Sequence, residues 1–110
     1  MTTHHKGLTI ERWSGMPFVE QMGNVGSEVE RTISWRAKKN EHYSQMAFER
    51  ALELLDLTRK DPKNASKLKE LGRVRECLVD YFMYFNEYGS TEESWKKYFY
   101  NFAYAARKNR

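Results

Sequence analysis

The chain has 110 residues, a mass of 13.2 kDa and a net charge of +4, and 40% of its residues are hydrophobic. This length fits one domain with a single core, and a content of only 6 Gly and 2 Pro argues against a disordered tail. The single cysteine, Cys77, excludes an internal disulfide, and no apolar run is long enough for a signal peptide or a membrane span. We therefore expect a cytoplasmic protein without membrane contact.

The first elements that we expect are an N-terminal arm over residues 1–16 and a single helical domain over residues 17–110. The arm contains Trp13, which needs a place to pack, and the adjacent histidines His4 and His5, for which no third ligand is spaced to complete a metal site. A first helix is predicted over 17–37. Its apolar stripe consists of Phe18, Met22, Val25, Gly26, Val29 and Ile33. Because Gly26 has no Cβ, it would allow another helix to approach closely.

A second helix is predicted over 41–60, after Asn40, a residue that favours helix N-caps. Its stripe comprises Phe48, Ala51, Leu52 and Leu55. Neither Gly nor Pro enforces the break at Lys39, so one continuous helix through this point stays open.

A third helix is predicted over about 64–87, because Asp61 and Pro62 end the second one. Its stripe comprises Leu68, Leu71, Val74, Leu78, Phe82 and Phe85. Tyr88 and Gly89 would end it, and Ser90 with Glu93 would form the capping box of a fourth helix. Strand signals are absent. The predicted fold is therefore all-α, an up-and-down four-helix bundle with short loops.

The fourth helix carries aromatic residues on two faces. Trp95, Tyr98, Phe99, Phe102 and Ala106 form the core stripe, whereas Tyr100 and Tyr104 lie on the opposite face beside Lys97 and Arg107. Tyrosine is enriched at protein interfaces, so these four residues are a candidate partner-binding surface. The alternative is that both tyrosines lie on the free surface or under the N-terminal arm. The surface favours a non-enzymatic interaction module that forms a homo-oligomer or binds another protein.

Residues 59–75 contain 7 basic and 2 acidic side chains. Lys63, Lys67 and Arg73 are the candidate nucleic-acid contacts of this segment. A solvated helix face is the alternative, because the segment lacks the interleaved aromatic residues that stack on bases.

Arg36 and Arg75 fall at positions where the helical pattern calls for apolar residues. A buried guanidinium needs a partner, and Glu28, Asp56 and Asp80 are the candidates, unless the arginines extend to solvent.

Arg36 and His42 are separated by five residues within this small all-α domain. The pair resembles the Arg-to-His signature of HEPN domains, helical-bundle dimers that include RNA-cleaving toxins. The resemblance implies a metal-independent ribonuclease or an RNA-binding protein, with Arg36 stabilising the phosphate and His42 acting as acid or base. The alternative for His42 is an exposed residue in the first turn of the second helix.

Two longer stretches, AFERALELLDLTRKDPKN and NEYGSTEESWKKYFYNFAYAARK, are similar to small bacterial proteins that form helical bundles. This resemblance supports the fold and supplies no activity. The chain lacks the metalloprotease, phosphate-loop and nucleophile motifs, so we expect no cofactor and no bound metal.

Overall fold

The computed structural model describes residues 10–108 and contains no strand within them. The elements in chain order are α1 (Ile10–Ser14), α2 (Phe18–Ala37), α3 (Glu41–Lys60), a 3-10 helix η1 (Pro62–Lys67), α4 (Leu68–Met83) and α5 (Glu92–Lys108). The prediction of an all-α bundle is confirmed. No helix of the described part combines the length and the apolarity needed to cross a membrane.

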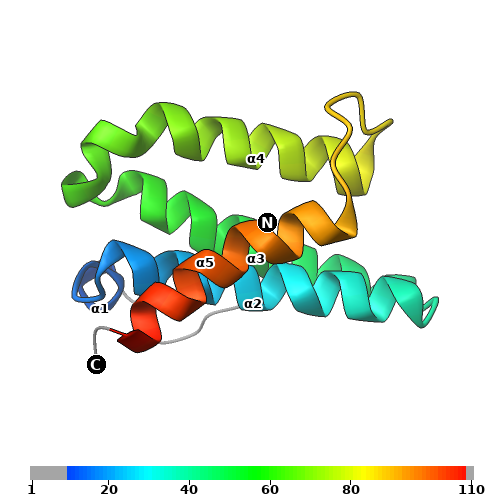
Figure 1. Ribbon diagram of the computed structural model, residues 1–110, viewed down its shortest axis with the longest axis horizontal. Coiled ribbons are helices and arrows are strands. Elements are labelled where there is room, and N and C mark those ends of the chain that lie inside the picture. Colours follow the sequence, from blue (N-terminus) through cyan, green and yellow to red (C-terminus); the bar gives the residue numbers. More distant parts are fainter. Residues whose placement is uncertain (1–9, 109–110) are drawn as a thin grey trace.

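Helix α2 is the central element of the bundle. It packs against α3 on one side and against α5 on another, while α4 lies along α3 (Figure 1). The apolar stripe predicted for α2 is buried from Met22 to Ile33. The predicted core face of α5 is also confirmed, because Trp95 and Phe99 are buried within the same core.

A turn separates α2 from α3. Lys39 adopts a left-handed backbone conformation with φ of 60°, which ends α2. The side chain of Asn40 accepts a hydrogen bond of 3.0 Å from the backbone N–H of Tyr43 and so caps α3. The two helices are therefore separate, and the continuous helix that the sequence left open does not form.

Gly26 permits a close crossing of α2 and α5, as predicted. A Cβ added at Gly26 would lie 2.6 Å from the Cβ of Phe99, nearer than carbon atoms approach without a clash. At Gly23, three residues earlier, the nearest atom of α5 is the Cα of Ala103, 3.8 Å from the position of such a Cβ. The close crossing thus depends on Gly26.

The described end of the predicted arm, residues 10–16, packs onto the bundle. Trp13 of α1 is buried, and its indole N–H donates to the hydroxyl of Thr58 on α3 over 3.0 Å. His4 and His5 lie outside the described residues. Trp13 therefore packs against α3, and it does not cover Tyr100 or Tyr104, which both stay exposed.

The predicted third helix is wrong at both ends. Residues 62–67 form the 3-10 helix η1, and α4 ends at Met83, before the predicted end at residue 87. Leu68 and Phe85 were predicted to lie in the core, but their side chains are 47% and 89% exposed. The carboxylate of Asp80 accepts hydrogen bonds from backbone N–H groups beyond α4, and this stabilises a loop in place of further helix.

The predicted capping box of the last helix is displaced by one residue. The hydroxyl of Thr91 accepts a hydrogen bond from the backbone N–H of Ser94, and the hydroxyl of Ser94 accepts one from the N–H of Thr91, both over 2.9 Å. This reciprocal pair satisfies donors at the start of α5, the role expected of Ser90 and Glu93.

Arg36 and Arg75, which the sequence left as either buried or extended to solvent, have different surroundings. Arg75 is partly buried and donates from Nε to Asp56 over 2.9 Å, so one of the predicted partners is confirmed. Arg36 is exposed, and its guanidinium carbon lies 5.3 Å from the ring centre of Tyr81 and 5.7 Å from that of Phe82. Arg36 is therefore not a buried cation that requires a carboxylate.

Candidate interaction surface

The outer face of α5 displays a stacked pair of tyrosines. Tyr100 and Tyr104 are 58% and 53% exposed, and their rings lie 6.4 Å apart at an angle of 26°. The guanidinium carbon of Arg107 lies 6.0 Å from the ring centre of Tyr100. Since the spacing of i to i+4 places these side chains on one helical face, they form a continuous apolar surface bordered by a cation.

A groove runs along the seam between α2 and α5, next to these tyrosines. The part of the groove toward the C-terminal end of α5 has a volume of about 610 Å³. Small residues of both helices, namely Gly23, Gly26, Ser27 and Ala103, line it together with Lys97, Tyr100 and Arg107. We call this part the lower α2–α5 groove. It contains three of the four predicted partner-binding residues, and the fourth, Tyr104, stacks on Tyr100.

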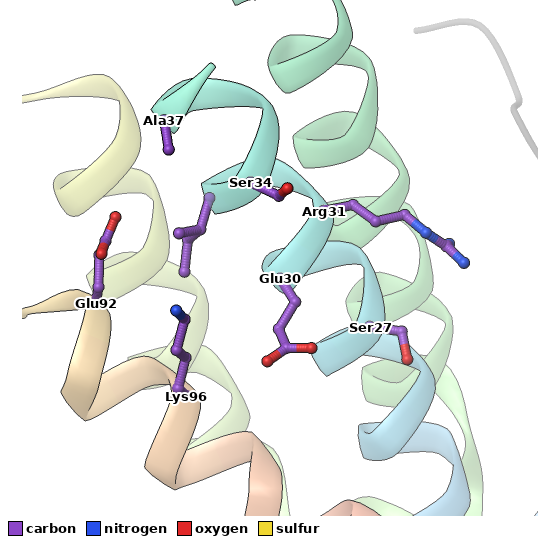
Figure 2. A pocket seen from close by; sticks show the side chains of 8 residues that line it. Ser27, Glu30, Arg31, Ser34, Ala37, Glu92 and Lys96 are labelled. Carbon is purple, nitrogen blue, oxygen red and sulfur yellow. The ribbon is translucent and has the colours of Figure 1, made fainter. Parts of the chain in front are cut away.

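The upper part of the groove lies beside the N-terminal end of α5. It is more polar and has a volume of about 550 Å³. Figure 2 shows Glu30 on α2 and Glu92 and Lys96 on α5 lining the space between the two helices. The side chain of Arg31 extends away from α5 and pairs with Glu28. Glu30, Ser27 and Lys96 also line the lower part, so the two parts are continuous.

The cations of the lower groove are available to a partner. Within residues 10–108, neither Lys96 nor Lys97 forms an ion pair, and the contact of Arg107 is with the ring of Tyr100. Glu30 is the carboxylate that lines this part. The lower groove therefore carries an excess of positive charge at its rim.

Basic side chains of the segment 59–75 form contacts within the protein that its sequence does not indicate. Lys63 pairs with Asp61 and donates to the backbone carbonyl of Ser14, and the ammonium of Lys67 lies 4.9 Å from the ring centre of Phe18. Arg73 is exposed. Intramolecular contacts thus engage two of the three predicted nucleic-acid residues, and nucleic-acid binding here stays a prediction.

Arg36 and His42 lie on either side of the turn between α2 and α3. Both are exposed, and the ring of His42 lies 5.6 Å from that of Tyr43. A surface cavity of about 440 Å³ is lined by Arg36 together with Ser44 and Phe82, but His42 does not line it. The alternative for His42, an exposed residue in the first turn of a helix, matches this position. The ribonuclease function stays a prediction from the resemblance alone.

Asp61, Cys77 and Tyr98 have a shifted pKa, and none of these three residues lines the α2–α5 groove. Burial would raise the pKa of Asp61, but hydrogen bonds from Lys63 and Gln21 outweigh it and hold the pKa at about 2. Burial raises the pKa of the Cys77 thiol, so this residue is a poor nucleophile. Burial, together with the nearby Glu70, raises the pKa of Tyr98.

The sequence did not indicate that the loop between α4 and α5 is a second exposed aromatic surface. Tyr84, Phe85 and Tyr88 are 69%, 89% and 61% exposed. The turn-forming residues of NEYGS could have marked the end of the helix earlier, because Asn and Gly tolerate positive φ. Asn86 and Gly89 do have φ of 53° and 69°.

Protein-family models, curated proteins and solved structures were compared with this chain, and no match was found. The function therefore has to be inferred from the residues themselves.

Proposed function

We propose that this protein is a non-enzymatic interaction module that self-associates through the outer face of α5 and the adjoining lower α2–α5 groove. The observation that carries the proposal is the exposed stack of Tyr100 on Tyr104 beside a groove of small residues. Aromatic side chains with low conformational freedom contribute most of the binding energy in many interfaces.

The chemistry of this surface suits binding better than catalysis. Its polar groups are a carboxylate, ammonium groups and a guanidinium around an apolar strip, and the shifted groups Asp61 and Cys77 lie elsewhere. A protein interface of this kind has an apolar centre with a charged rim. The lower groove and the two tyrosines have this arrangement.

The proposal is tested by the double substitution Tyr100→Ser and Tyr104→Ser, with the mass followed by sedimentation equilibrium. Because each lost aromatic contact at an interface costs about 1 kcal/mol or more, we expect the dissociation constant to rise at least about tenfold. The melting temperature should stay nearly unchanged, since both side chains are exposed.

The matched control is Tyr43→Ser. Tyr43 is 46% exposed on α3 and lies outside the lower groove. Its replacement should leave self-association unchanged. An equal loss of mass in both variants, or unchanged mass in the double variant, would contradict the proposed surface.

A further inference from the structure

The loop between α4 and α5 displays the most exposed aromatic side chain of the described chain. Phe85 is 89% exposed, with Tyr84 and Tyr88 on either side of it. We call residues 84–88 the aromatic loop. Single exposed apolar residues are common, but three exposed aromatic side chains within five residues form a patch of the kind that binds a partner.

The aromatic loop is held in one conformation by its own hydrogen bonds. The buried carboxylate of Asp80 accepts from the backbone N–H groups of Glu87 and Tyr88 over 3.0 and 3.1 Å. The side chain of Asn86 donates to the carbonyl of Ser90 and accepts from its N–H, both over 2.8 Å. These hydrogen bonds preorganise the aromatic loop, because a loop that is already ordered loses less conformational entropy on binding.

The charge of the aromatic loop is opposite to that of the lower α2–α5 groove. The one charged residue within 84–88 is Glu87, which is acidic. The rim of the groove carries Lys96, Lys97 and Arg107 against Glu30. Two surfaces of opposite charge, each with exposed aromatic residues, are complementary.

The aromatic loop does not occupy the groove of its own chain. It projects from one end of the molecule, whereas the last turns of α5 lie toward the other end (Figure 1). Phe85 is exposed in this arrangement, and the hydrogen bonds of Asp80 hold it there. An aromatic loop that enters the groove must therefore come from another molecule.

A symmetric pairing of two α5 helices is disfavoured by charge. If Tyr100 of one copy faced Tyr104 of an antiparallel copy, Lys97 would face Arg107 by the same register. Like charges opposite one another cost free energy, and among residues 10–108 no carboxylate forms an ion pair with Lys97 to compensate. The acidic aromatic loop supplies the missing complement.

We propose that the aromatic loop of one copy docks into the lower α2–α5 groove of a second copy, with Phe85 against the small residues and Glu87 near the cations. This inference rests on the proposed function and names the partner of its surface. Each copy has one aromatic loop and one groove, so the contact is head to tail and produces a ring or a filament.

The test uses two complementary full-length variants. The loop variant, Phe85→Ser with Tyr88→Ser, retains an intact groove. The groove variant, Lys97→Glu with Arg107→Glu, retains an intact aromatic loop. All four side chains are exposed, so we expect both variants to keep the wild-type circular dichroism spectrum and melting temperature. Each variant alone should sediment as a monomer.

Mixing the two variants should restore one contact and one only. The groove of the loop variant can receive the loop of the groove variant, so an equimolar mixture should form a dimer with twice the monomer mass and nothing larger. A mixture that remains monomeric would overturn the head-to-tail pairing.

The wild-type mass separates failure of this inference from failure of the proposed function. A monomeric wild type would overturn both. A wild-type oligomer that dissociates on Tyr100→Ser and Tyr104→Ser but persists in the loop variant would support the proposed surface and overturn the docking of the aromatic loop.

Discussion

Two aspartates accept hydrogen bonds that fix two different regions of this protein. The region around Asp61 is buried, whereas the region around Asp80 is an exposed loop. Asp61 joins α2, α3 and η1 in a buried network, in which Gln21 donates to it over 2.9 Å and Asn64 donates to Gln21 over 2.9 Å. Asp80 holds the aromatic loop, whose side chains extend into solvent.

The difference shows how a structural polar cluster is told from a prepared binding surface. Around Asp61 the partners Gln21, Asn64 and Thr58 are buried, and the surface residue Lys63 completes the cluster with an ion pair, so the network stabilises the fold. Around Asp80 the same kind of carboxylate-to-backbone bond fixes a loop in which the side chain of Phe85 is 89% exposed. A loop whose hydrogen bonds keep apolar side chains exposed to water is therefore a candidate binding surface for a partner.

The largest expected effect is that of Asp61→Ala. It removes the acceptor of the buried Gln21 amide and the ion-pair partner of Lys63, which leaves a buried donor unpaired. We expect the free energy of unfolding to fall by about 3 kcal/mol. Urea denaturation followed by circular dichroism measures it. A loss no greater than that of an average surface substitution would contradict a structural role for this network.

The second effect is a dependence of stability on pH that comes from Asp61. The pKa of Asp61 is about 2 in the folded protein against 3.8 ordinarily. Because the folded pKa is the lower one, the contribution is complete above pH 4 and is lost as the pH falls toward 2. It amounts to about 2 kcal/mol.

Urea denaturation at a series of pH values checks this dependence. Between pH 4 and pH 2, wild type should lose about 2 kcal/mol more than Asp61→Asn, which has no carboxylate to protonate. Parallel losses in the two proteins would show that other carboxylates account for the acid sensitivity.

The smallest effect on stability is that of Asp80→Ala, which should cost only about 1 kcal/mol, because water can replace the carboxylate at the exposed loop. Its effects should instead be local. Hydrogen exchange at the amides of Glu87 and Tyr88 should accelerate, and self-association should weaken several-fold as the loop loses its conformation. Unchanged exchange at both amides would mean that Asp80 does not fix the loop.

The sequence predicted the fold well where periodicity and caps agreed. The stripe from Met22 to Ile33, the cap at Asn40 and the close approach at Gly26 all follow from local rules, and the structure confirms them. Periodicity failed for Phe85, since a helical pattern continues through residues that a single aspartate diverts into a loop. Bonds between distant residues, such as those of Trp13 to Thr58, cannot be read from local patterns.

The candidate site was predicted in part for the same reason. Tyr100, Lys97 and Arg107 were found because helical spacing places them opposite the core stripe of α5. The small residues of α2 that line the groove were not recognised as part of it, because their meeting with Ala103 depends on how two helices cross. The hydrogen bond from Lys63 to the backbone carbonyl of Ser14 likewise joins residues far apart in the sequence.

The most direct test of self-association is sedimentation velocity of the wild-type protein at two salt concentrations, with and without a short mixed-sequence RNA. An interface anchored by aromatic residues should give a mass above the monomer's 13.2 kDa at both salt concentrations, unchanged by RNA. A monomer that binds RNA and releases it with added salt would contradict the account and favour nucleic-acid binding.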